Sequence, residues 1–77
     1  MTVKEQVIQL LKEVKPTMNL ENTTDIIDGG YLDSLGLMTF ITRLCDCFWF
    51  EMDIDWITPE NFNSVDAIVK LVEGLIS

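Results

Sequence analysis

Apolar residues recur at helical spacing in three separate segments of this 77-residue chain, and this pattern is the strongest constraint on its fold. The three sets are Val3, Val7, Leu10, Leu11 and Val14; Leu37, Phe40, Ile41, Leu44 and Phe48; and Val65, Ile68, Val69, Leu71, Val72, Leu75 and Ile76. Trp49 to Asp55 alternates apolar and acidic residues as a strand does, but no second strand is available to pair with it, so we expect an extended connector there. The chain is therefore predicted to be all-α, with residues 1–77 forming one small domain.

Residues with strong capping preferences mark where the helices begin. Thr2 with Glu5 three residues later forms a capping box, and either Asp33 or Ser34 can cap the second helix. Thr58 is a further capping residue, and Pro59 follows it at the first position of the helix, which proline favours. We predict helices from Thr2 to about Lys15, from Asp33 or Ser34 to about Phe48, from Thr58 through Phe62, and from Ser64 to about Ile76.

The first two predicted helices are joined by a connection of about eighteen residues, against a usual length of about four to six in compact domains. Most of its residues favour turns, and its apolar anchors are Met18, Leu20, Ile26 and Ile27. A loop of this length indicates a functional or tightly packed segment. It ends in Gly30-Tyr31-Leu32-Asp33-Ser34-Leu35-Gly36, which brings a serine to the start of the second helix.

Ser34 is the candidate site residue, because its hydroxyl lies at a helix N-terminus. Backbone N–H groups converge at such a position, and the helix dipole there favours negative charge. The position therefore suits a phosphate ester.

The chain carries 5 basic and 13 acidic residues, which give a net charge of −8. This charge repels nucleic acid and predicts partners with basic surfaces. The longest apolar run is only a few residues, and the first residues lack the apolar stretch of a signal peptide. We therefore expect a cytoplasmic protein that does not insert into membranes.

Two cysteines, Cys45 and Cys47, are expected to be partly buried free thiols. Side chains two positions apart on a helix diverge, so a disulfide between them is geometrically poor. The sequence has no histidine and no Cys-x-x-Cys pair, so no metal site is expected.

Asp33-Ser34-Leu35, placed between the long loop and the second helix, resembles the corresponding motif of the acyl carrier protein family. Further matches, which extend the resemblance over nearly the whole chain, are Phe40, Ile41, Leu44, Phe48, Ile54 and the segment Thr58-Pro59-Glu60-Asn61-Phe62-x-Ser64-Val65. The resemblance implies a four-helix bundle of acyl-carrier type, with a long loop between the first two helices and a short third helix. It also implies a phosphopantetheine group, taken from coenzyme A, attached to Ser34.

Such a carrier is not an enzyme, because it holds an acyl or aminoacyl group as a thioester and leaves the chemistry to its partners. The implied partners are a phosphopantetheinyl transferase, an adenylating or acyl-loading ligase and a downstream acyl or aminoacyl transferase, with the carrier itself a monomer. In the family, the residue that matches Asp33 also helps the modifying enzyme to hold its metal. Magnesium therefore belongs to the loading step.

The Gly30 to Gly36 segment is similar to that of D-alanyl carrier proteins and of free-standing aminoacyl or peptidyl carriers. Fatty acid carriers usually show a leucine-glycine pair shortly before the serine and several acidic residues along the second helix, and this chain departs from both features. The resemblance favours an amino acid or peptide-type cargo, with a fatty or polyketide acyl chain as the alternative. The candidate partner-binding residues, outside the buried stripe of the second helix, are Leu35, Met38, Thr39 and Thr42.

Trp49 is unusual, because the family commonly has a small or polar residue at this position. Since aromatic residues are more often buried, we expect Trp49 and Trp56 to be core or edge aromatics.

Two other functions remain open. A hydrolase with Ser34 as nucleophile needs a base such as histidine, which the sequence lacks. An unmodified helical interaction module has no need of the Ser34 hydroxyl.

Overall fold

The computed structural model describes residues 2–16 and 23–76, and within these ranges the regular structure is entirely helical. The elements are α1 (Val3–Val14), α2 (Ser34–Phe48), the 3-10 turn η1 (Ile54–Trp56), α3 (Pro59–Phe62) and α4 (Val65–Ile76). The prediction of an all-α bundle with a short third helix is confirmed. The extended connector is found at residues 50–53, but the prediction is wrong for Ile54 and Asp55, which lie in the 3-10 turn. The side chain of Asp53 caps this turn by accepting from the Asp55 N–H at 2.9 Å.

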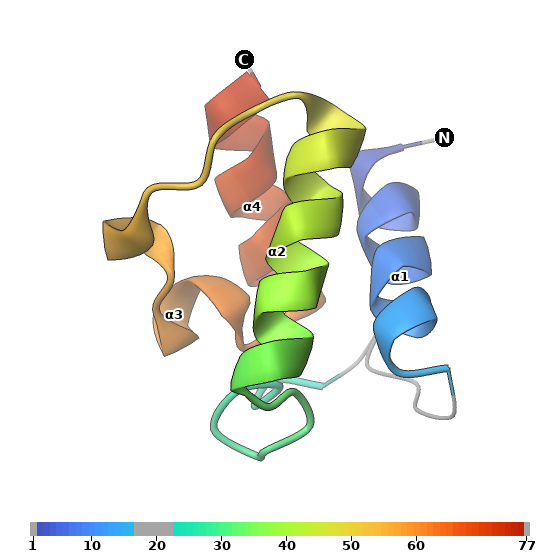
Figure 1. Cartoon of the computed structure of the whole chain (residues 1–77), viewed down its shortest axis with the longest axis vertical. Coiled ribbons are helices and arrows are strands. Elements are labelled where there is room, and N and C mark those ends of the chain that lie inside the picture. Colours follow the sequence, from blue (N-terminus) through green and yellow to red (C-terminus); the bar gives the residue numbers. More distant parts are fainter. Residues whose placement is uncertain (1, 17–22, 77) are drawn as a thin grey trace.

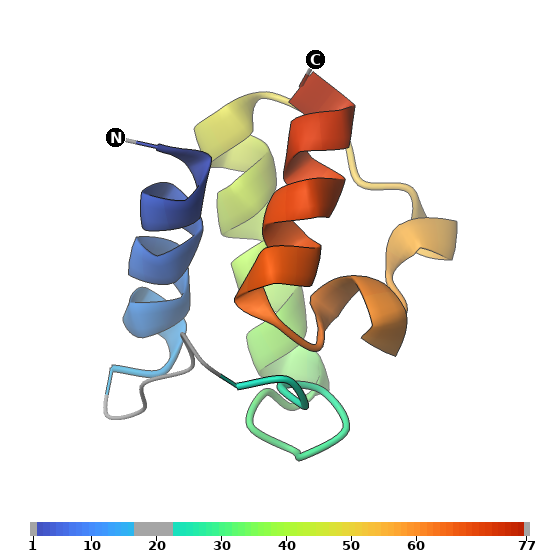
Figure 2. The same cartoon turned by 180° about the vertical axis from the view of Figure 1, so that it is seen from behind.

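The helices are arranged so that one end of the bundle carries both chain termini and the end of α2 (Figures 1 and 2). α1 runs away from this end, and α2 and α4 run back toward it. α1 packs against both α2 and α4, and α3 packs against α4. The loop that leads into α2 crosses the opposite end, so Ser34 lies far from both termini (Figure 1).

The core contains residues from every α-helix and from the loop before α2. Its buried members are Val7, Leu11, Ile26, Leu32, Phe40, Ile41, Leu44, Phe62, Val65, Ile68 and Val72. Burial of each large apolar side chain contributes roughly 1.5–3 kcal/mol, so this cluster is the main source of stability. Ile26 and Leu32 anchor the two ends of the loop segment that precedes Ser34, whereas Met18 and Leu20 lie outside the described residues.

The residues of the predicted apolar faces lie in the core or pack against it, except at the end of α4. Leu37 and Phe48 are half-buried and pack against the core. Ile76 is 45% exposed, so the predicted apolar face of α4 extends beyond the core at this end. The last turn of α4 lies at the open end of the bundle, where no other helix covers it (Figure 1).

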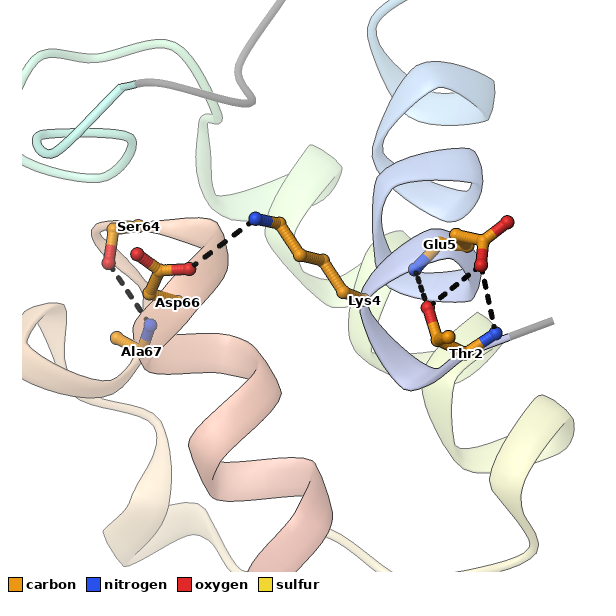
Figure 3. A network of polar contacts seen from close by, with 6 residues as sticks. All are labelled: Thr2, Lys4, Glu5, Ser64, Asp66 and Ala67. Atoms are coloured by element: carbon orange, nitrogen blue, oxygen red, sulfur yellow. Dashed lines mark hydrogen bonds and ion pairs between the residues drawn. The ribbon is translucent and has the colours of Figure 1, made fainter.

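The helix starts form as their capping residues predict. Thr2 Oγ1 accepts a hydrogen bond from the Glu5 N–H at 3.1 Å, and Glu5 Oε1 accepts from the Thr2 N–H at 3.2 Å (Figure 3). Thr58 Oγ1 accepts from the Asn61 N–H at the start of α3. Ser64 Oγ accepts from the Ala67 N–H at 3.1 Å at the start of α4 (Figure 3).

Lys4 and Asp66 form an ion pair between α1 and α4, with Nζ and Oδ1 4.0 Å apart (Figure 3). Both side chains are well exposed, so water and salt screen the attraction. The pair therefore adds little to the apolar packing that holds these helices together.

Candidate functional site

Asp33 caps α2 and makes Ser34 the first residue of that helix. Asp33 Oδ1 accepts a hydrogen bond from the Gly36 N–H at 2.6 Å, and the Asp33 carbonyl accepts from the Leu37 N–H at 2.8 Å. One of the otherwise unpaired N–H groups of the helix start is thereby satisfied. The predicted start of the second helix at Asp33 or Ser34 is confirmed.

Ser34 itself is exposed, as are its neighbours Asp33 and Leu35. A phosphate ester on the Ser34 hydroxyl would lie in solvent next to the positive end of the α2 dipole. The exposed hydroxyl and the favourable field fit the attachment of a phosphopantetheine group at this position.

The loop before Ser34 makes a tight turn that depends on glycine. The Gly29 N–H donates to the Asp25 carbonyl at 2.6 Å, and a Cβ at Gly29 would come within 2.6 Å of the same oxygen. Gly30 has a φ of +76°, which favours glycine. Both positions of this turn therefore favour glycine.

Asn63, at the end of α3, holds this loop and was not identified from the sequence. It is the unassigned position between Phe62 and Ser64 in the matched segment, yet its side chain accepts from the Ile27 N–H and the Asp28 N–H. These partners lie 36 and 35 residues earlier in the chain. The only sequence signal is the type of residue, because asparagine often bonds backbone groups near helix ends.

The four predicted partner-binding residues lie together on one exposed face of α2. Leu35 is 77% and Met38 52% exposed, and Thr39 and Thr42 are also exposed. The two threonine hydroxyls donate to the carbonyls of Leu35 and Met38, each at 2.9 Å, so they are already paired within the helix. We call these four residues the α2 face. It is apolar and uncharged on a chain of net charge −8.

Trp49 differs from the sequence expectation. It is 91% exposed and ends α2 in the left-handed region, with φ 59° and ψ 50°, so its assignment as a core or edge aromatic is wrong. Phe48 and Phe50 on either side both pack on the core and stack with their ring centroids 6.3 Å apart. The chain turns between them, which leaves Trp49 outside. Trp56 is 37% exposed, so it is not a core residue either.

The cysteines are both free, but they differ in environment. Cys45 is half-buried, and this burial raises the pKa of its thiol. Cys47 is exposed, so the expectation of a partly buried thiol is wrong there. Its Sγ donates to Gln6 Oε1 at 3.3 Å, at the edge of a shallow hollow of about 200 Å³ between α1 and the end of α2 that does not include Ser34.

Two further features concern only the described part of the chain. No three of its cysteine or acidic side chains are grouped closely enough to hold a metal ion. None of the helices found there combines the length and the apolar character needed to cross a bilayer.

Comparison with known proteins identifies relatives along almost the whole chain. No protein-family model matches it. It is 32% identical over 80 residues to the D-alanyl carrier proteins of Streptococcus pyogenes serotype M5 (strain Manfredo), serotype M49 (strain NZ131) and serotype M1. The matched region covers 97% of this chain and 96% of each relative. The chain therefore belongs to the family of carrier proteins that includes these D-alanyl carrier proteins, and it is a carrier and not an enzyme.

Proposed function

We propose that this chain carries D-alanyl groups as thioesters on a phosphopantetheine arm attached to Ser34, and that it delivers them to partner enzymes. The observation that carries the proposal is the exposed Ser34 at the first position of α2, directly after the capping Asp33. The name of the relatives supports the cargo, because each is a D-alanyl carrier protein that matches 97% of this chain. A fatty or polyketide acyl cargo is not favoured.

Attachment of the arm requires the Ser34 hydroxyl to act as a nucleophile toward coenzyme A. A bond forms between Ser34 Oγ and the phosphorus next to the pantetheine part, and the bond from that phosphorus to the nucleotide part breaks. In this proposal the serine proton passes to a base on the transferase. Asp33 uses Oδ1 in the cap, so Oδ2 is the oxygen that we expect to reach a magnesium ion held by the transferase.

Once attached, the arm supplies a terminal thiol that holds the cargo as a reactive thioester. The rest of the chain tethers and presents it. Tethering raises the effective concentration of cargo at a docked partner, so each docking contact can be weak and release can be fast.

Docking of these partners is assigned to the α2 face. Leu35 and Met38 are exposed next to Ser34, and a flexible thioether suits contact with more than one partner. Arg43, which directly follows Thr42, is paired with Glu13 at 3.1 Å and so adds no free positive charge. The partners that we expect here are the transferase, an adenylating ligase that loads D-alanine and a downstream transferase, acting on a monomeric carrier in the cytoplasm, where coenzyme A is available.

The cargo is tested by loading the modified chain in competition. The phosphopantetheinyl form is incubated with ATP and equal amounts of D-alanine, L-alanine and octanoate, together with a D-alanine ligase and, separately, a fatty acyl ligase. The proposal predicts an intact mass increase of one alanyl group that hydroxylamine removes, as expected for a thioester, and chiral analysis of the released group should identify it as D-alanyl. Loading by the fatty acyl ligase alone would contradict the D-alanyl assignment.

A further inference from the structure

Asn63 binds the backbone of the loop segment directly before Ser34, which we call the pre-serine loop (residues 26–32). Its carbonyl accepts from the Ile26 N–H at 2.9 Å, and its side-chain Oδ1 accepts from the Ile27 and Asp28 N–H groups at 2.9 and 3.0 Å. Its Nδ2 donates to Asp28 Oδ2 at 3.0 Å. One residue therefore makes four hydrogen bonds to three successive residues of the loop.

These bonds complete the pairing of the pre-serine loop. The N–H groups of residues 29 to 32 bond within the chain segment itself, to the carbonyls of Asp25, Ile26 and Ile27. The N–H groups of residues 26 to 28 have Asn63 instead. Backbone N–H groups are strong donors that folded chains almost always pair, so loss of the Asn63 side chain would leave the N–H groups of Ile27 and Asp28 to water, while the Ile26 N–H keeps the backbone carbonyl of residue 63.

Hydrogen bonds within the loop connect the segment that Asn63 holds to the residues just before Ser34. The Ile26 carbonyl accepts from the N–H groups of both Tyr31 and Leu32, at 3.1 and 3.3 Å, which ties the end of the loop to its start. The Leu32 side chain is buried, and its Cδ2 lies 3.6 Å from where a Cβ on Gly36 would be. A shift of Ile26 therefore moves Leu32, and Leu32 lies two residues before Ser34.

We propose that Asn63 is a positioning residue for the reaction at Ser34, because it holds the pre-serine loop in the one conformation that presents the hydroxyl to the phosphopantetheinyl transferase. This inference rests on the proposed function. Without the three bonds of the Asn63 side chain, only a fraction of the chains would present Ser34 correctly. The apparent affinity of the transferase for the carrier falls in proportion to that fraction, whereas the chemical step on a correctly bound chain is unchanged.

The test reverses the direction of one hydrogen bond, the bond that Asn63 Nδ2 donates to Asp28 Oδ2. In Asn63→Asp, the acceptor for the loop N–H groups remains, but a second carboxylate oxygen faces the carboxylate of Asp28 and the two repel. Asp28→Asn alone keeps an acceptor for Asn63 and should load as the wild type does. In the double variant, the new amide of residue 28 can donate to the new carboxylate of residue 63, which restores the bond in the opposite direction.

Asn61→Asp is the matched control. Asn61 lies on the same short helix and its Nδ2 donates to the Trp56 carbonyl at 2.8 Å, away from the pre-serine loop. This variant makes the same chemical change and adds the same charge as Asn63→Asp. Any effect of added negative charge on transferase binding is therefore common to both.

Initial rates of transfer from coenzyme A by a broad-specificity phosphopantetheinyl transferase are measured by intact mass over a range of carrier concentrations. We expect Asn63→Asp to raise KM about tenfold with kcat within about twofold, since a misplaced reacting group can cost up to about a hundredfold. The double variant should return KM to within about twofold of the wild type. Asp28→Ala removes only the bond from Asn63 Nδ2 and should raise KM about twofold. This variant replaces Asn63→Asp as the test if Asn63→Asp does not fold.

An independent measurement separates this inference from the proposed function. Amide hydrogen exchange of Ile27 and Asp28, and the NMR shift of the Ser34 amide, should change in Asn63→Asp and return in the double variant. Equal KM values for Asn63→Asp and Asn61→Asp would overturn the positioning role, and so would an unchanged Ser34 amide. If the wild type accepts no phosphopantetheine, the proposed function fails, and the Ser34 amide shift still decides whether Asn63 positions Ser34.

Discussion

Asp33 Oδ1 and the Gly36 N–H are 2.6 Å apart, and the hydrogen bond between them closes the first turn of α2 around Ser34. The same aspartate stands directly before the serine that is proposed to take up the arm. It therefore has a structural role that the structure shows and a role in loading that follows from the resemblance to carrier proteins. Substitutions can separate the two, because a cap needs only an oxygen acceptor whereas a metal contact needs the carboxylate.

Asp33→Ala removes the cap and should lower the free energy of unfolding by about 1 kcal/mol. For a chain of this size, that loss corresponds to a decrease in Tm of about 4–8 °C. Asp33→Asn keeps an acceptor for the Gly36 N–H and should melt within about 2 °C of the wild type. It should still lose much of the rate of phosphopantetheine transfer. Equal melting temperatures for the alanine variant and the wild type would contradict the capping role.

Met38→Ala tests the assignment of docking to the α2 face. Met38 is 52% exposed, so little packing within the chain is lost. An anchor of an interface typically contributes about 1 kcal/mol or more, so KM for the transferase should rise about fivefold or more. Ile76→Ala is the control, since Ile76 is 45% exposed at the end of the bundle opposite Ser34 (Figure 1). A KM that rises equally in both variants would count against a specific role for this face.

Trp49 occupies a backbone conformation that suits glycine, with φ 59° in a residue that is 91% exposed. The left-handed conformation costs a non-glycine residue about 1–2 kcal/mol, and glycine is the usual residue at such a helix end. Trp49→Gly should therefore raise the free energy of unfolding by about 1 kcal/mol in a denaturant titration. A loss of stability instead would mean that the indole contributes packing that its exposure does not indicate.

The capping box of α1 predicts a pH dependence of stability. The Thr2 N–H and Thr2 hydroxyl donate to Glu5 and lower the pKa of its carboxyl in the folded chain. The stabilisation is therefore fully present above the pKa of the unfolded state, and it is lost as the pH falls through the lower pKa of the folded state. Thr2→Ala keeps the backbone N–H, which is the larger cause, so an NMR titration should show the Glu5 pKa rising only part of the way to its ordinary value. A pKa that does not change in this variant would exclude the hydroxyl as a contributor.

The fold could be predicted from the sequence where its causes are local. Thr2, Asp33, Thr58 and Ser64 each accept a hydrogen bond from an N–H only three residues later, so capping types identify these helix starts directly. Apolar spacing identified the buried stripe of α2 for the same reason. The site residue Ser34 followed from its place between loop and helix.

Other features depend on the tertiary arrangement and were not predictable in this way. Asn63 binds residues about 35 positions away, and no local pattern encodes such a pairing. The exposure of Trp49 results from the packing of Phe48 and Phe50 on either side of it, whereas aromatic character alone predicts burial. Ile76 has the spacing of a core residue but lies where no other helix covers α4.

The central claim is that Ser34 takes up phosphopantetheine, and the most direct measurement is an intact mass of the chain after incubation with coenzyme A, magnesium and a broad-specificity phosphopantetheinyl transferase. The account predicts a gain of one phosphopantetheinyl group on the wild type and none on Ser34→Ala, with circular dichroism showing the same helix content in both. No gain on the folded wild type with several transferases, or an equal gain on Ser34→Ala, would contradict the assignment of the carrier site to Ser34.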